Sequence, residues 1–225
     1  MKTIHFSNSL KDRNPNIFFG LIEVSEVSVA ASRDHFDNEL SLLESELQDK
    51  FCDSAPSENG VISATRRMYR SAGWEPTKYR PSSEALLRRL IKGSGLYKIN
   101  NVVDYANLVS ARYHIPLGLY DLEKIKGEIF IDIGQEGETY QGISKPLINA
   151  SGKIILRDDQ GVFGNPTADS LRTSIQKETT DVLTVFFVGP GIAQSYVDTM
   201  IDKLISYYAL FSNPSTIRRN VILPR

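Results

Sequence analysis

The sequence predicts an α+β fold in which a mixed or antiparallel sheet is flanked by helices. Three observations favour this class. Helical and strand-like patterns alternate along the 225 residues without an internal repeat, no stretch resembles a long linker, and residues 182–188 are apolar on both faces of a strand. A strand of that kind is typical of the centre of a sheet that is covered on both sides. We therefore expect a single domain over residues 1–225.

The helices are predicted from apolar residues spaced three and four apart. In residues 32–51, for example, Phe36, Leu40, Leu43 and Leu47 follow this spacing. Ser82 or Ser83 is a suitable N-cap for a helix that ends near Gly93. The predicted helices span about 32–51, 62–74, 83–91, 101–115 and 192–211.

The strands are predicted from short β-branched and aromatic runs bounded by turn residues. The first such run precedes the helices, and most of the others follow Pro116. The predicted strands span about 16–24, 128–133, 139–143, 153–157, 182–188 and 216–223.

Composition limits the function without naming one. The chain is 41% hydrophobic and 24% charged with a formal net charge of -1, so its overall charge favours neither nucleic acid nor membrane. Cys52 is the only cysteine and His5, His35 and His114 are scattered, which argues against an intrachain disulfide or a metal centre. No nucleotide fingerprint, nucleophile with its base, signal peptide or membrane span is evident. We expect a cytoplasmic protein with no cofactor.

The run INNVVDYAN at residues 99–107 places polar groups on a helix that apolar spacing predicts to be buried. Asn100 or Asn101 can cap the first turn, and Asp104 can reach back to its free amides. Asn107 lies one turn beyond Asp104 on the same face. An amide at this position either fixes a neighbouring loop or faces a ligand.

Positive charge is concentrated between Arg66 and Lys98. This span contains nine Lys and Arg residues and only two Glu residues, which gives a local net charge of +7. Like charges four residues apart on a helix repel each other unless an anion relieves them. With aromatic residues interleaved, the span favours a phosphate backbone with stacked bases. Solvated helix faces over core aromatics are the alternative. The candidate RNA-binding residues are Arg66, Arg67, Arg70, Arg88, Arg89 and Lys92.

A part of the chain resembles the editing (B3/B4) domain of the bacterial phenylalanyl-tRNA synthetase β subunit. The resemblance lies in the order of its motifs, which are INNVVD, Asn, Pro, aromatic-Asp and Gly-Glu. The residues that carry the resemblance are Ile99 to Asp104, Asn107, Pro116, Tyr120-Asp121, Leu122, Gly127 and Gly137-Glu138. Residues 80–188 resemble that module most closely. The synthetase's other modules do not fit in 225 residues, so the chain resembles a free-standing editing domain with no aminoacylation activity.

The resemblance implies a tRNA-binding domain that hydrolyses misacylated aminoacyl-tRNA in trans. It implies Asn107 as the catalytic residue and a substrate pocket formed by Asp104, Ala106, Pro116, Gly118 and Asp169. Two of these positions depart from the family, and the alignment of a third is open. Ala106 stands where the synthetases usually have Thr, Gly118 stands where they have His, and Asp169 is a candidate for the acidic residue that recognises the tyrosine hydroxyl, with Ser170 and Leu171 as alternatives.

A glycine at position 118 predicts a pocket that is enlarged or open to solvent, and therefore an altered aminoacyl specificity. Two other function classes compete with the hydrolase. One is a non-catalytic RNA-binding module that contacts a synthetase, and the other is an amino-acid-binding regulator. The departures at Ala106 and Gly118 favour these two classes, whereas Asn107 and the basic span favour the hydrolase.

Overall fold

The computed structural model describes residues 2–13 and 16–224. The helices are α1 (Asn8–Arg13), α2 (Asp34–Lys50), α3 (Gly60–Ser71), α4 (Ser82–Ile91), α5 (Asn101–Tyr113) and α6 (Gln194–Phe211), with short 3-10 turns η1 (Pro56–Glu58) and η2 (Leu122–Lys124). The strands are β1 (Ile4–Phe6), β2 (Phe18–Ser25), β3 (Leu117–Asp121), β4 (Ile129–Ile133), β5 (Thr139–Tyr140), β6 (Ile148–Asn149), β7 (Ile154–Asp158), β8 (Gly161–Asn165), β9 (Ala168–Asp169), β10 (Val182–Val188) and β11 (Thr216–Ile222).

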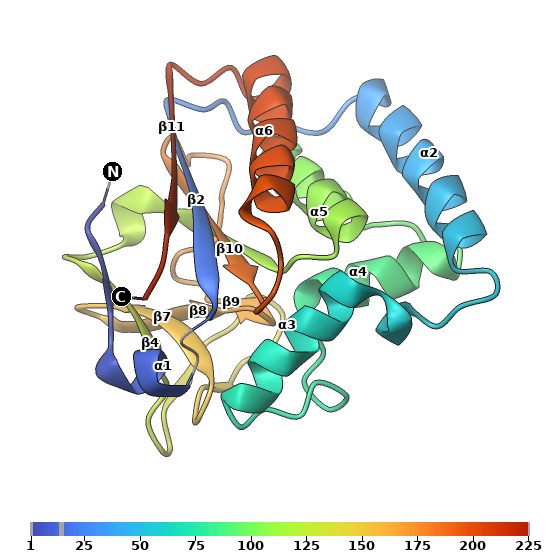
Figure 1. Cartoon of the computed structure of the whole chain (residues 1–225). Coiled ribbons are helices and arrows are strands. Elements are labelled where there is room, and N and C mark those ends of the chain that lie inside the picture. Colours follow the sequence, from blue (N-terminus) through green and yellow to red (C-terminus); the bar gives the residue numbers. More distant parts are fainter. Residues whose placement is uncertain (1, 14–15, 225) are drawn as a thin grey trace.

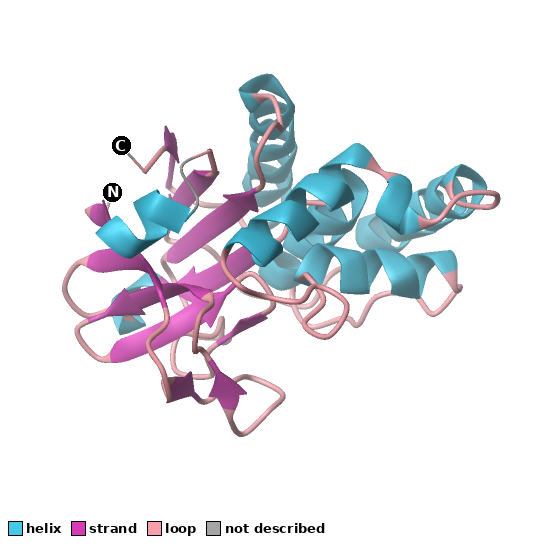
Figure 2. Ribbon diagram, turned by 60° about the horizontal axis from the view of Figure 1, so that its bottom comes forward, coloured by secondary structure: helices cyan, strands magenta, loops and turns pink. Residues whose placement is uncertain are grey.

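The strands form two main sheets. A four-stranded sheet has the order β11-β2-β10-β3 and is antiparallel throughout. A five-stranded sheet has the order β1-β4-β7-β8-β9, and its β1–β4 pair is parallel. Helices α2 to α6 gather on one side of the molecule and the strands on the other (Figures 1 and 2). The predicted α+β class, with mixed and antiparallel sheets flanked by helices, is confirmed.

Strand β10 is buried along its whole length, as its apolar sequence predicted. Alternate side chains of a strand point to opposite faces. Leu183 and Phe187 accordingly belong to the core that the two sheets share, whereas Phe186 and Val188 belong to the core beneath the helices. The four-stranded sheet is therefore the middle layer of the molecule, and both cores depend on it.

Several element ends differ from the prediction. Helix α3 ends at Ser71 and does not reach Trp74. It stops because Gly73 adopts a φ of 84°, which is incompatible with a right-handed helix. Helix α4 begins after Pro81 without a side-chain cap, and the Ser83 hydroxyl donates instead to the carbonyl of His114 at 3.1 Å. The sequence patterns also missed β3 and β8, because these strands are short and interrupted by glycine. The strand expected at 139–143 covers only Thr139–Tyr140.

Asn101 joins three parts of the helical layer. Its Oδ1 accepts from the amide of Ala30 at 2.9 Å, and its Nδ2 donates to the carbonyls of Ser28 at 2.9 Å and Phe211 at 2.6 Å. The residue is only 3% exposed. A single buried amide thus ties the start of α5 to the loop after β2 and to the end of α6.

Within residues 2–13 and 16–224, no helix combines the length and apolarity that crossing a lipid bilayer requires.

Asn101→Ala should lower the free energy of unfolding by roughly 2–4 kcal/mol, because it removes three hydrogen bonds to backbone groups at about 0.5–1.5 kcal/mol each. Asn107→Ala is the matched control on the same helix. It should cost less than about 0.5 kcal/mol, as is usual for a partly exposed side chain without a partner. Urea unfolding of both variants measures the difference. Equal losses of unfolding free energy in the two variants would show that the hydrogen bonds of Asn101 do not stabilise the contact between these segments.

Candidate functional site

The polar groups at the start of α5 mostly serve the helix itself. Asn100 Oδ1 accepts from the amide of Val103 at 2.9 Å, which caps the first turn. Asp104 Oδ1 accepts from the amide of Ile99 at 2.8 Å, and its Oδ2 accepts from the Ser32 hydroxyl at 2.7 Å. Burial raises the pKa of Asp104 above its ordinary value despite these hydrogen bonds. Asp104 thus reaches back past the first turn, but the amide from which it accepts belongs to Ile99, one residue before the N-cap Asn100.

Asn107 is the exception among these carboxamides. Its side chain is partly exposed and makes no hydrogen bond to any residue that the structure describes. Its neighbour Ala106 is fully buried among the apolar side chains beneath the helices. The loop-fixing role that the sequence left open for Asn107 belongs to Asn101, and the Asn107 amide remains available to a ligand.

Pro116 and Gly118 lie where the chain leaves α5 and enters the four-stranded sheet. The carbonyl of Pro116 accepts from the amide of Phe187 at 2.9 Å, so this residue extends the pairing of β3 with β10. Gly118 belongs to β3 and pairs with Val185. Since Leu117 and Leu119 pack beneath the helices, Gly118 faces the other layer, toward the five-stranded sheet.

The space beside Gly118 is filled by Tyr120. A Cβ atom at position 118 would lie 2.0 Å from the Tyr120 hydroxyl oxygen, and one at Gly164 would lie 2.3 Å from the same oxygen. Tyr120 is fully buried. The expectation that Gly118 enlarges the pocket or opens it to solvent is therefore wrong, because the two glycines make room for the chain's own phenol ring.

Asp169 lies at the same place. Its Oδ1 would be 2.9 Å from a Cβ at position 118, and its Oδ2 accepts from the amide of Leu119 at 3.2 Å. Oδ1 of Asp169 and the Tyr120 hydroxyl are both buried, and neither makes a well-formed hydrogen bond with the described part of the chain. Burial raises the pKa of Asp169 to about 7, and the nearby Tyr120 hydroxyl and Leu119 amide offset only part of that effect. A perturbed carboxyl group of this kind is typical of functional sites.

Further polar groups surround this pair. Tyr140 donates its hydroxyl to the carbonyl of Ala168 at 2.6 Å and accepts from Asn165 Nδ2 at 2.7 Å. The hydroxyls of Tyr69 and Thr167 are 2.9 Å apart. We name the group of Gly118, Tyr120, Tyr140, Gly164 and Asp169 the phenol cluster. Sequence reasoning placed Gly118 and Asp169 in the site but not the other three residues, and it named Tyr120 only as part of the family resemblance. Contacts between strands distant in sequence assemble the cluster.

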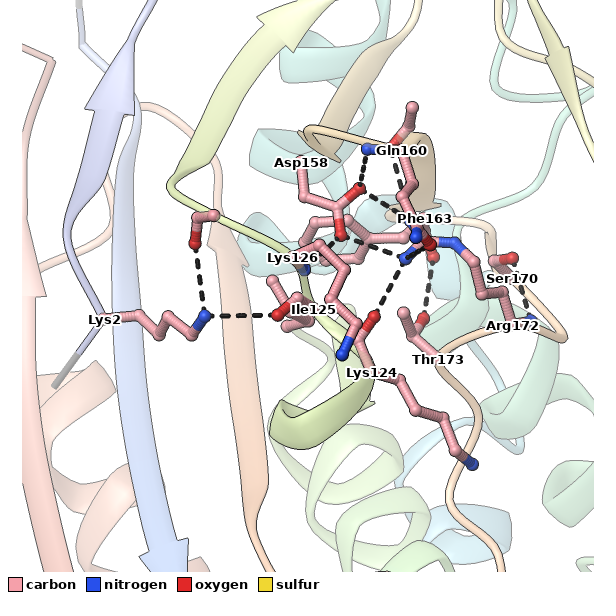
Figure 3. A network of polar contacts seen from close by, with 12 residues as sticks. Lys2, Lys124, Ile125, Lys126, Asp158, Gln160, Phe163, Ser170, Arg172 and Thr173 are labelled. Carbon is pink, nitrogen blue, oxygen red and sulfur yellow. Dashed lines mark hydrogen bonds and ion pairs between the residues drawn. The ribbon is translucent and has the colours of Figure 1, made fainter.

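The segment that follows Asp169 is held by several polar contacts, and Figure 3 shows those of Ser170, Arg172 and Thr173. The guanidinium of Arg172 donates to both carboxylate oxygens of Asp158, at 2.8 and 3.0 Å, and to the carbonyl of Lys124 at 2.9 Å. The amide of Asp121 donates to the carbonyl of Thr173 at 2.8 Å. These bonds anchor residues 170–173 against the end of β3.

The predicted pocket residues divide between two layers. Asp104, Ala106 and Asn107 belong to α5 in the helical layer, whereas Gly118 faces Asp169 on the other side of β3. Among these residues, Gly118 and Asp169 are the pair that is distant in sequence and that the fold brings into direct proximity. A surface hollow of about 610 Å³ lies elsewhere, at the end of β4 beside Gly134 and Ser151. Across the described ranges, no three His, Cys, Asp or Glu side chains are grouped to hold a metal ion.

The candidate RNA-binding arginines are less free than their sequence suggested. Arg66 donates from Nε and from a terminal nitrogen to the buried Glu84, at 2.9 and 2.7 Å, and Arg88 Nε donates to Glu84 at 2.9 Å. Arg67 donates to the carbonyl of Pro190, and Arg89 donates to the carbonyls of Ser94 and Gly95. Glu84 thus supplies an internal anion for Arg66 and Arg88, which the charge pattern alone did not reveal. Arg70 and Lys92 are exposed.

The family model of the B3/4 domain matches residues 64–209. The chain belongs to the B3/4 domain family. The matched range contains α4, α5, most of α3 and α6, the phenol cluster and all the candidate site residues named above.

The relatives of this B3/4 domain include phenylalanine–tRNA ligase β subunits. That of Fusobacterium nucleatum is 32% identical over 105 residues, which are 43% of this chain and 12% of the relative. That of Onion yellows phytoplasma is 29% identical over 130 residues, which are 56% of this chain and 16% of the relative. The B3/4 chain therefore aligns with only a small part of the length of these subunits.

A solved N-terminal fragment of the phenylalanyl-tRNA synthetase β subunit from Pyrococcus horikoshii matches 96% of this chain and 50% of its own length. Its TM-score is 0.48 and its sequence identity is 14%.

Asp169→Asn should change how stability depends on pH. The ordinary pKa of 3.8 rises to about 7 on folding, so between roughly pH 4 and 7 the folded state holds a proton that the unfolded state has released. Stability from this group therefore falls as pH rises through that window and is flat above it. The variant should remove this fall and be more stable than the wild type at pH 8 by on the order of a few kcal/mol.

Urea unfolding of both proteins at pH 5 and pH 8 measures this effect, with the exposed Asp159→Asn as control. If the wild type and Asp169→Asn showed the same pH dependence, Asp169 would be ionised in the folded state throughout the range.

Proposed function

We propose that this B3/4 domain binds tRNA and hydrolyses the ester bond of misacylated aminoacyl-tRNA in trans. One observation carries the proposal. Asn107 is a carboxamide on a rigid, well-capped helix whose side chain has no hydrogen bond to any described residue. The names of the relatives, phenylalanine–tRNA ligase β subunits, point to tRNA as the partner.

The reaction suits a site without a nucleophile. The ester of an aminoacyl-tRNA is activated by the neighbouring ribose hydroxyl and by the amino group, so the protein needs chiefly to orient water and stabilise the oxyanion. The Asn107 amide can donate a hydrogen bond to the oxyanion or accept one from the attacking water. Asn100 and Asp104 hold the helix turn that presents Asn107.

Asn107→Ala should lower the deacylation rate by about 10²-fold, the usual effect of losing one preorganised donor. The assay measures release of the amino acid from a panel of correctly and incorrectly charged tRNAs, with the unfolding transition recorded in parallel. Asn107→Asp is the matched control because it keeps the shape but loses the donor, so it should also be slow. Full activity per folded molecule in Asn107→Ala would show that another group performs the chemistry.

The phenol cluster bears on specificity. Because Tyr120 fills the space beside Gly118 and Asp169, the pocket that these residues form has no room for a second phenol ring. We therefore propose that tyrosine is not the preferred aminoacyl group.

Phenylalanine tRNA that carries tyrosine should be deacylated about tenfold or more slowly than the best substrate in the panel. The tyrosyl side chain would clash with Tyr120, and this clash must be relieved before the substrate binds. The exchange Gly118→His with Ala106→Thr, which restores the synthetase residues, should not raise that rate, because the new Cβ meets the Tyr120 hydroxyl at 2.0 Å. Rapid tyrosyl hydrolysis by the wild type would refute this specificity.

A second candidate is a non-catalytic RNA-binding module. The filled space beside Gly118 and the burial of Ala106 favour it, since both remove room or polarity from a catalytic pocket. Binding of tRNA without deacylation of any member of the panel would support this module.

A further inference from the structure

Three arginines converge on a single buried carboxylate where α3 meets α4. Glu84 is 1% exposed, and Arg66 binds both of its oxygens. Arg88 Nε lies 2.9 Å from Glu84 Oε1, and Arg80 Nε lies 3.9 Å from the same atom. Burial raises the pKa of Glu84, but the hydrogen bonds from Arg66 and Arg88 outweigh that effect and hold the pKa below its ordinary value. The carboxylate is therefore charged at neutral pH.

The three arginines are not equivalent. The side chain of Arg66 is 14% exposed and uses two of its nitrogens on Glu84, whereas those of Arg80 and Arg88 are 46% and 36% exposed. Arg80 and Arg88 each approach Glu84 through Nε, which leaves their terminal nitrogens without a hydrogen bond to the described residues. Because both Nε atoms lie within 3.9 Å of the same oxygen, the two exposed side chains meet at Glu84.

One carboxylate does not neutralise three guanidinium groups. Glu75, which follows α3, also attracts Arg66 but is exposed and bonded to Thr77. The surplus positive charge lies on Arg80 and Arg88. Two adjacent guanidinium groups with free terminal nitrogens match the oxygens of a phosphate group, which they bind in bidentate fashion.

The arginine pair lies beside the segment that leads to the phenol cluster. The amide of Ser82 donates to the carbonyl of Pro166 at 3.1 Å. Pro166 precedes Asp169 by three residues. The hydroxyl oxygen of Ser82 is buried and lacks a hydrogen-bond partner among the described residues.

We propose that Arg80 and Arg88, held in place by Glu84, bind a phosphodiester group of an RNA strand. The proposal rests on the proposed function, of which it names the phosphate-contacting residues. It adds Arg80 to the candidates and assigns Arg66, Arg67 and Arg89 to structural roles, because those guanidinium groups are engaged within the chain. Glu84 is a positioning residue.

The test is a salt titration of tRNA binding with two matched double variants. Arg80→Gln with Arg88→Gln removes the proposed contacts, and Arg67→Gln with Arg89→Gln removes two charges from the same part of the chain. Each lost phosphate contact lowers the slope of log affinity against log salt by about 0.7–0.9. Because the two arginines share one phosphate group, the first variant should lose about 0.7–0.9 from the slope and bind about tenfold more weakly at low salt. The second should keep most of the wild-type slope.

The outcomes separate this inference from the proposed function. Wild-type binding with an unchanged slope in Arg80→Gln/Arg88→Gln would overturn the phosphate site and leave tRNA binding intact. Equal losses in the two double variants would also overturn it, since the charge would then act without a defined site. Absence of tRNA binding by the wild type would overturn both proposals. Thermal unfolding of each variant confirms that the folded protein is compared.

Glu84→Gln tests the positioning role. The substitution makes the cluster more positive, so attraction by net charge alone predicts tighter tRNA binding. Loss of the anchor for Arg80 and Arg88 predicts weaker binding and a smaller slope. Tighter binding by the folded variant would overturn the role of Glu84.

Discussion

The burial of β10 on both faces is the constraint on which the rest of the structure depends. Its side chains alternate between the core shared by the two sheets and the core beneath the helices, so a shift of register by one residue would exchange the two sets. Gly20 of β2 is part of the same constraint. A Cβ there would approach Ile201 Cδ1 of α6 to 3.0 Å, so the glycine allows the helix to lie close to the middle sheet. The layers on either side are built around this strand.

That layered arrangement explains the division of the candidate site. Strand β3 is an edge of the middle sheet, with α5 packed on one face and β9 near the other. Asn107 is presented by the helical layer, whereas Gly118 and Asp169 meet between the sheets. In sequence these residues look like parts of one pocket. In the fold, an aminoacyl group that used both sets would have to pass around the edge at β3, where Tyr120 already occupies the space beside Gly118.

Electrostatics inside the chain change the meaning of its most basic span. The sequence shows an excess of positive charge but not which charges are paired, since pairing depends on contacts between α3 and α4. Glu84 forms ion pairs with Arg66 and Arg88 and lies close to Arg80. The basic span therefore connects α3 to α4 and still carries surplus positive charge. A buried ion pair of this kind costs desolvation and is maintained by good geometry. The fold therefore distinguishes the arginines that are paired within the chain from those whose terminal nitrogens remain available to a ligand.

The sequence by itself determined the α+β class, the central place of residues 182–188, most helices and the capped start of α5, because local periodicity and capping depend on near neighbours. It also determined the family, because the order of polar residues from 99 to 138 is local. Only the tertiary structure decided that Asn101 rather than Asn107 fixes the neighbouring loop and that Tyr120 fills the space beside Gly118. It likewise decided that Glu84 neutralises part of the basic span. Each of these depends on groups that are distant in sequence and meet only when the layers pack.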